Sequence, residues 1–182
     1  MRSLAFPFAL SFALSVGLGT PARAQQQAGP VIMKGGTHAP VPGATFAVPV
    51  DLAYRVEWDI NVGSAKPDEV NDRYNVPARF LNQAAAIGVP RANVAVAIVV
   101  HGTAGEEMLN NEEYRARKGV DNPNIPLLEE MSRAGVRIIL CGQTVASRKM
   151  PRDRILPFVQ VAPSAAWAHA VLQRQGYTVN PF

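Results

Sequence analysis

The sequence predicts an α/β fold in which a mostly parallel sheet of about five strands lies between two helix layers. Short runs of β-branched and aliphatic residues alternate along the chain with segments of helical apolar spacing, a pattern typical of parallel sheets with right-handed crossovers. The chain has 182 residues, 48% of them hydrophobic, which suits a single domain with a sizeable core.

The first 24 residues have the pattern of a cleaved signal peptide. Arg2 supplies a positive start, an apolar stretch runs from Leu4 to Leu18, and Ala22-Arg23-Ala24 is a small-residue cleavage signal. The apolar stretch is shorter than the about 20 residues that a membrane-spanning helix needs. We therefore expect cleavage after Ala24, a periplasmic or secreted protein, and no membrane span in the mature chain.

Removal of the signal peptide lowers the positive charge of the chain. Without Arg2 and Arg23, 16 of the 18 basic residues remain against 14 acidic ones, so the formal net charge falls from +4 to +2. The remaining sequence contains no basic run and no interleaved aromatic and basic residues. It therefore predicts no nucleic-acid partner.

Residues 25–50 are rich in proline and glycine. Prolines at this density prevent a regular helix or an interior strand. Val31, Ile32 and Phe46 are nevertheless too apolar for a purely solvated tail. We expect an extended arm that lies on the body of the domain or on a neighbouring subunit, followed by the α/β domain at residues 51–182.

The first half of that domain predicts two strands and one helix. In the first strand, residues 52–60, the side chains of Glu57 and Asp59 alternate with apolar ones, which is typical of an edge or half-exposed strand. The first helix begins near Asn75, a good N-cap, and stops at Gly88. The second strand, residues 93–100, is the most apolar stretch of the mature chain and is followed directly by His101.

The second half predicts three strands, two clear helices and a long loop. Residues 103–120 are polar, so we expect mostly a mobile loop. A helix follows Asn122-Pro123, and a third strand ends at residue 141. After a short fourth strand at residues 158–161, Ser164 caps a helix that should bury Trp167 and Val171 and turn His169 outward. Residues 177–179 form the last strand.

Cys141, the only cysteine, stands at the carboxyl end of the third strand. Strand carboxyl ends line the ligand-binding crevice of open α/β sheets. The residues that follow, 142–144, form a turn into another helix, whose N-terminal N–H groups and dipole would favour a thiolate. An odd cysteine in an exported chain indicates a reactive thiol or intermolecular pairing. The alternative is a buried cysteine that acts as a small hydrophobe.

His101 and Cys141 follow strands that are consecutive in the chain. If these strands are also adjacent in the sheet, the imidazole would lie close enough to influence the thiol. The alternative is that His101 only caps the turn before Gly102.

Three thiol chemistries can be compared. A phosphatase loop needs an arginine six positions after its cysteine, where this chain has Ser147, with Arg148 one position late. A Cys-His hydrolase needs a base and an orienting group, for which Asn61 or Asp59 is available. A persulfide carrier needs only an accessible thiolate of low pKa. Of the three chemistries, it therefore requires the fewest other polar groups around the cysteine.

Cofactor and metal signals are weak. The sequence contains no Walker A motif and no GxGxxG after a strand, so it predicts no cofactor. The histidines at positions 38, 101 and 169 and the single cysteine lack metal-ligand spacing, so it also predicts no metal site.

Several motifs resemble the DsrE/DsrF-like family: VAVAIVVHG, NPN, LLEEMSRAGVRIILCGQT and QGY, within residues 52–179. The resemblance implies a flavodoxin-like or Rossmann-like single domain that assembles into trimers or hexamers. It also implies a strand-end cysteine that accepts sulfane sulfur as a persulfide and relays it. That role falls on Cys141, with His101 as a neighbouring site residue. The further residues expected to line the site are Asn61, Gly102, Asn122, Gly142, Gln143 and Thr144.

The sequence as a whole predicts sulfur binding or relay through Cys141, with a sulfur donor or acceptor protein or a small sulfur compound as partner. One alternative is a non-catalytic oligomeric module that binds a small ligand or a partner in the same crevice. The other is a thiol hydrolase that uses Cys141 and His101.

Overall fold

The computed structural model describes residues 26–180 and contains a five-stranded, all-parallel sheet. The strands lie in the order β4-β3-β2-β1-β5, and their bounds are β1 Tyr54–Ile60, β2 Val94–Val100, β3 Arg137–Cys141, β4 Gln160–Ala162 and β5 Thr178–Asn180. The predicted α/β fold class is confirmed. The predicted signal peptide lies outside the described residues.

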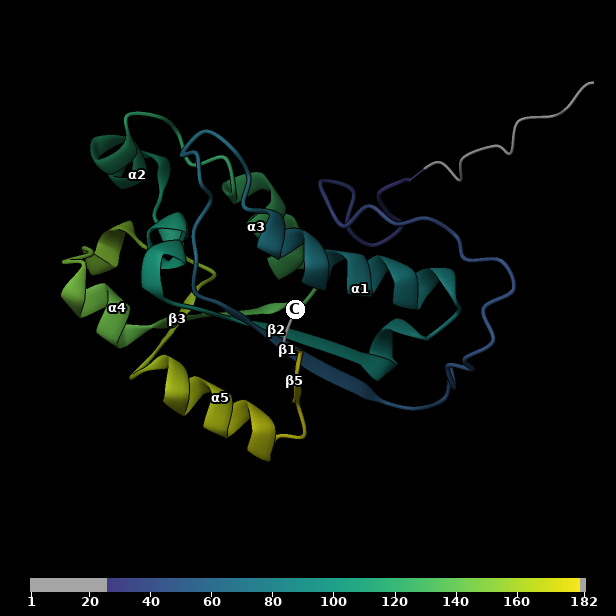
Figure 1. Cartoon of the computed structure of the whole chain (residues 1–182). Coiled ribbons are helices and arrows are strands. Elements are labelled where there is room, and N and C mark those ends of the chain that lie inside the picture. The colour runs from purple at the N-terminus through teal and green to yellow at the C-terminus, as the bar shows by residue number, and fades with distance from the viewer. Residues whose placement is uncertain (1–25, 181–182) are drawn as a thin grey trace, which may run out of the picture.

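Helices cover both faces of the sheet (Figure 1). The α-helices of the described residues are α1 Asn75–Ala86, α2 Asn111–Lys118, α3 Ile125–Arg133, α4 Gly142–Ser147 and α5 Ala165–Arg174. Helices α1 and α3 lie on one face, and α5 crosses the other face between the two edge strands. Every residue of β2 except Ala95 is buried, because this strand has neighbours on both sides and helices on both faces. No helix within residues 26–180 has the length and apolar character that crossing a membrane requires.

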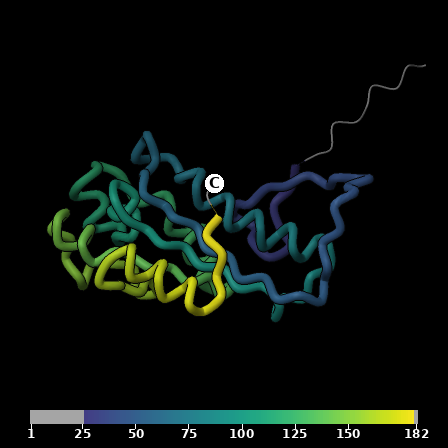
Figure 2. Tube along the Cα trace, turned by 60° about the horizontal axis from the view of Figure 1, so that its bottom comes forward, coloured from purple at the N-terminus to yellow at the C-terminus, as the bar shows by residue number. Residues whose placement is uncertain are grey.

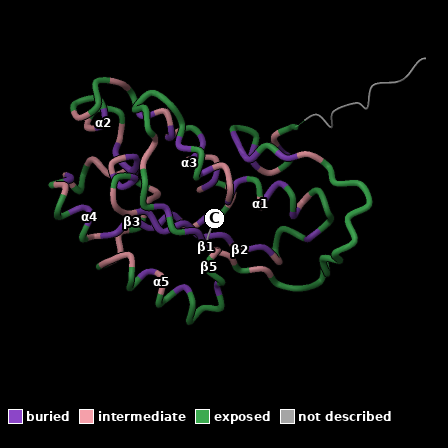
Figure 3. The backbone as a smooth tube through the Cα atoms, in the orientation of Figure 1, coloured by how far each residue is buried: buried purple, intermediate pink, exposed green. Residues whose placement is uncertain are grey.

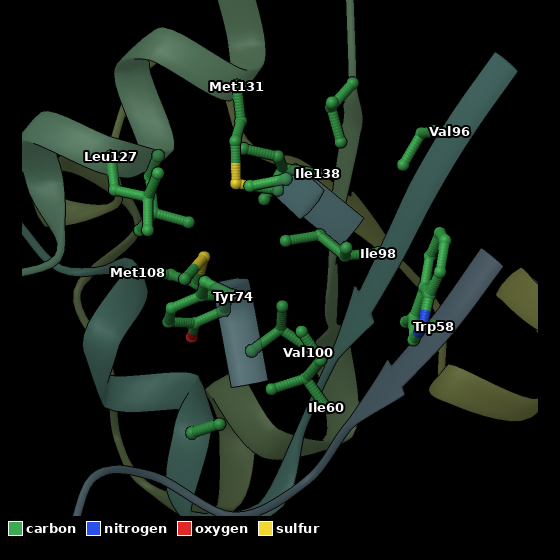
Figure 4. Close-up of a cluster of buried hydrophobic side chains, with 14 of the residues drawn as sticks. Trp58, Ile60, Tyr74, Val96, Ile98, Val100, Met108, Leu127, Met131 and Ile138 are labelled. Carbon is green, nitrogen blue, oxygen red and sulfur yellow. The ribbon is translucent and has the colours of Figure 1, made fainter. Parts of the chain in front are cut away.

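Two hydrophobic clusters hold the layers together. The larger lies between the sheet and helices α1 and α3, where Tyr74, Leu127 and Met131 pack over Ile98 and Val100 (Figure 4). The smaller lies under α5 and contains Ala97, Val99, Ile139, Ala168, Leu172 and Tyr177. Alternate residues of each central strand therefore face opposite helix layers.

Strand β1 is not an edge strand, which corrects that part of the prediction, but it is partly exposed at Arg55 and Asp59. It lies between β2 and β5, and the side chain of Glu57 is fully buried. Alternation of charged and apolar residues usually indicates that one face of a strand is in contact with solvent. Helix α5 covers this face at Glu57, to which it brings His169.

The segment after β2 corrects the prediction of a mobile loop. Residues 102–108 form a 3-10 helix, and α2 follows with Asn110 as its N-cap. Ala104, Met108 and Tyr114 anchor the segment in the main cluster. The apolar anchors are few and irregularly spaced, so no helical period is visible in the sequence.

Helix α5 is rotated relative to the prediction. Trp167 and Val171 are 65% and 47% exposed, whereas Ala168 and Leu172 are buried. Ala165, Ala168 and Leu172 face the sheet, and His169 is turned toward β1.

The first part of the arm is fixed to α1. Asn82 accepts hydrogen bonds from the N–H groups of Val31 and Ile32 and donates to the carbonyls of Ile32, Gly35 and Gly36. Residues 40–53 are largely exposed, as the green tube in Figure 3 shows. The arm lies at the end of the molecule opposite α4 (Figure 2).

Candidate functional site

Cys141 lies at the carboxyl end of β3, where the chain changes face. The connection from β3 to β4 packs Val145 and Met150 into the main cluster, whereas α5 leaves β4 on the opposite face. In open α/β sheets, ligands bind at the carboxyl ends of two neighbouring strands whose connections leave on opposite faces of the sheet. Ile139 faces α5 and Leu140 faces the main cluster, so strand alternation directs Cys141 toward α5.

Hydrogen-bond donors converge on the sulfur of Cys141 from two helices. Burial, the largest influence, raises the pKa of the thiol. The backbone N–H and hydroxyl of Thr144, the N–H of Ala165 and the N–H of Gln143 outweigh it and lower the pKa. Gln143 and Thr144 are in the first turn of α4, and Ala165 begins α5. Peptide dipoles at both helix starts therefore favour the thiolate.

Cys141 is buried, with 5% of its surface exposed. A buried thiol surrounded by hydrocarbon would have a raised pKa. The sulfur here faces N–H and O–H donors instead, which is a polar lining for an anion.

Two glycines permit the close approach of strand ends at this site. A Cβ on Gly142 would lie 2.6 Å from the carbonyl oxygen of Ala162, so only glycine lets the end of β4 pass here. Gly102 has φ +57, and a Cβ there would lie 2.3 Å from the carbonyl oxygen of Asn61. Gly142 and Gly102 thus shape the backbone of the site.

Thr144 connects the loops that follow β2 and β3. Its Oγ1 accepts a hydrogen bond from the N–H of Gly102 at 3.2 Å. The hydroxyl hydrogen can therefore be donated to the sulfur of Cys141. Gly105 leaves room for the Thr144 methyl group, which would lie 2.4 Å from a Cβ at that position.

His101 is in register with Cys141. Val100 pairs with Leu140, so the next positions along β2 and β3 are His101 and Cys141, on strands about 4.8 Å apart. The hydrogen bond that His101 makes is to Asp59: its Nε2 lies 2.8 Å from Oδ1 of that residue. His101 is 29% exposed and is oriented by Asp59, with its side chain on the same face of the sheet as Cys141.

Two further ionisable residues extend this row across the α5 face. Nε2 of His169 lies 3.0 Å from the same Asp59 oxygen, and its Nδ1 lies 3.1 Å from Oε2 of Glu57. Burial is the main cause of a raised pKa at Glu57, against the lowering influence of His169. The row therefore runs from the buried Glu57 to His101, which follows the carboxyl end of β2.

The remaining predicted site residues have different roles. Asn61 lines a pocket of about 570 Å³ beside Asp59, and its carbonyl accepts the N–H of Thr103 at 3.0 Å. The side chain of Gln143 donates to the carbonyl of Pro163 at 3.3 Å. Neither interaction involves the sulfur.

Asn122 does not line the crevice. It is 3% exposed, and its amide donates to the carbonyls of Glu107 and Leu109 and accepts from the N–H of Asn124. Asn122 is a structural residue that fixes the segment between β2 and α3, because its hydrogen-bonding groups are used within the fold.

Sequence reasoning missed Glu57, His169 and Ala165 as site residues. Ala165 could have been found, because Ser164 was a visible N-cap directly after the fourth strand. Glu57 and His169 are 112 positions apart, and the sequence had no signal for their pairing. Within residues 26–180, no group of three or more His, Cys, Asp or Glu side chains could hold a metal ion.

One of three comparisons with known proteins identifies a family. A family model described as "DsrE/DsrF-like family" matches residues 66–181. No curated protein matches the chain. Among solved structures, a protein of unknown function from Methanobacterium thermoautotrophicum is 18% identical with a TM-score of 0.48, and the match covers 71% of this chain and 99% of that one.

Proposed function

The chain belongs to the DsrE/DsrF-like family, and from this membership we propose that Cys141 accepts a sulfane sulfur as a persulfide and relays it. One observation carries the proposal: N–H groups from the first turns of α4 and α5 and the hydroxyl of Thr144 converge on the sulfur. This lining stabilises an anionic sulfur, which is the form that attacks a sulfur–sulfur bond. The same donors would stabilise a persulfide anion on Cys141.

The transfer needs no oxidant or reductant beyond the donor persulfide. The proton of Cys141 passes to His101, and the thiolate attacks the outer sulfur of a donor persulfide R–S–SH. A bond forms between the Cys141 sulfur and that outer sulfur, and the donor's S–S bond breaks. The leaving thiolate R–S⁻ takes the proton from His101, which gives Cys141–S–SH and R–SH.

Intact-mass analysis after incubation with a persulfide donor or thiosulfate tests the proposal. We expect a mass gain of one sulfur atom, which dithiothreitol reverses and Cys141→Ser abolishes. Cys141 is the only cysteine, so any reversible adduct reports this site. A wild-type protein that reacts with iodoacetamide at Cys141 but takes up no sulfur from either donor would refute the proposal.

We also propose export and self-association as the context of this function. Residues 1–24 would direct the chain to the periplasm or outside the cell, where the donor or acceptor is a protein or a small sulfur compound. Phe46 and Trp167 are 86% and 65% exposed, and a trimer or hexamer would give them a surface to bury against. Cell fractionation with N-terminal sequencing tests export, and light scattering of the mature chain tests assembly.

The contact between His101 and Asp59 favours a second candidate, a thiol hydrolase. Nε2 of His101 at 2.8 Å from the Asp59 carboxylate is the base-and-orienter pair that such enzymes use. This activity would release an acyl group from an activated ester in a burst that equals the enzyme concentration.

A Cys141→Ser protein with full biological activity would instead favour a non-catalytic binding module.

A further inference from the structure

Four side chains form a hydrogen-bonded row: Glu57, His169, Asp59 and His101. If both carboxyl groups are ionised and both imidazoles are neutral, this row has one hydrogen too few for its contacts. Its three contacts, of 3.1, 3.0 and 2.8 Å, each need one hydrogen. Two neutral imidazoles and two ionised carboxylates carry only two hydrogens between them. The geometry therefore requires one additional proton within the row.

The burial of the two carboxyl groups decides where that proton resides. The side chain of Glu57 is fully buried, and its Oε1 has no hydrogen-bond partner within residues 26–180. The side chain of Asp59 is 37% exposed and accepts from two imidazoles. A negative charge is far less costly on Asp59 than on Glu57, because Asp59 has water and two donors around it.

We propose that Glu57 is a protonated, neutral carboxylic acid that donates to Nδ1 of His169 and, through His169 and Asp59, sets the tautomer of His101. His169 then donates its Nε2–H to Asp59, and His101 donates its own Nε2–H to the same oxygen. Nδ1 of His101 is left as the ring nitrogen that can exchange a proton with Cys141. Glu57, Asp59 and His169 are positioning residues in this scheme. Only the proton exchange between His101 and Cys141 rests on the proposed function.

The ionisable surroundings of the row are few. From α5, His169 faces Glu57, and from its own strand Asp59 lies next to it. Strand β5 pairs with Glu57 through Val179 and has no ionisable side chain between Thr178 and Asn180. The other end of the row is His101, which reaches Asp59 from the end of β2.

Nitrogen NMR of histidine-labelled protein at neutral pH tests the proton assignment without using any sulfur chemistry. The chain has three histidines, so His38→Gln, His101→Gln and His169→Gln assign every signal. We expect His101 and His169 both to be neutral and protonated at Nε2. A doubly protonated His169 ring, or His101 protonated at Nδ1 alone, would overturn the proposal.

The pH profile of Cys141 alkylation by iodoacetamide tests whether the row acts on the thiol. We expect His169→Gln to move the midpoint of the profile downward by about half a unit, roughly threefold in thiolate fraction, because Asp59 loses its His169 donor and then holds a proton on His101 more strongly. The same change should have no effect in a His101→Gln background, because His169 acts through His101. Glu57→Gln should keep the wild-type profile, since its amide N–H replaces the carboxyl O–H.

Gln173→Ala, on the exposed side of α5, is the matched control and should leave the profile unchanged. A His169→Gln effect that persists without His101 would overturn the coupling. Wild-type alkylation and NMR that behave as expected, with no sulfur uptake from a persulfide donor, would refute the sulfur relay and leave the proton assignment standing.

Discussion

The hydroxyl of Thr144 offers a sharp test of what makes the Cys141 thiol acidic. Thr144→Val removes one of the four donors that lower the pKa of Cys141 and leaves the side-chain shape nearly unchanged. A hydrogen bond to a charged group contributes about 1.5 to 3 kcal/mol. The lower end applies here, because sulfur is a weak acceptor and three N–H donors remain. We therefore expect the pKa to rise and the thiolate fraction at neutral pH to fall about tenfold.

Thiolate absorbance and iodoacetamide alkylation, each measured across pH, provide the assay. The single cysteine makes both signals specific to Cys141. Thr144→Ser is the matched control, because it keeps the oxygen that accepts from Gly102 and the hydroxyl that donates to sulfur. If Thr144→Val and Thr144→Ser give the same profile as the wild type, the hydroxyl does not stabilise the thiolate and the reasoning about the site fails.

Three other predictions concern the fold and the row of ionisable residues. The raised pKa of Glu57 means that the folded state binds a proton more tightly than the unfolded state, so stability is present at low pH and is lost as pH rises through the folded pKa. Chemical denaturation across pH should show this loss for wild type and not for Glu57→Gln, with exposed Glu69→Gln as the control. Gly142→Ala should destabilise the protein by about 1 to 3 kcal/mol and slow alkylation, because its Cβ meets the Ala162 carbonyl; unchanged thermal unfolding would contradict this. Asn82→Ala should make residues 26–38 more sensitive to limited proteolysis while the remainder stays folded, and a wild-type cleavage pattern would contradict this.

Apolar runs and helix caps in the sequence were sufficient to predict the fold class. Continuous apolar runs such as residues 94–100 and 138–141 are typical of strands buried on both faces, and the sheet is covered in this way. The first helix begins at Asn75 and ends two residues before Gly88, as predicted, but its N-cap is Tyr74 and not Asn75, whose side chain accepts from the N–H of Gly36 instead. These signals are local, because they depend on the period of apolar residues and on the conformations that caps and glycines allow.

The position of Cys141 was also determined by the sequence, since a lone cysteine after a buried strand and before a helix can only lie at the carboxyl end of the sheet. The chemistry around it was decided by tertiary structure. The N–H of Ala165 reaches the sulfur only because β4 lies beside β3. Glu57 and His169 meet only because α5 crosses the face of β1. Residues more than a hundred positions apart carry no shared period or spacing, so their contact is specified by packing and not by any local pattern in the chain.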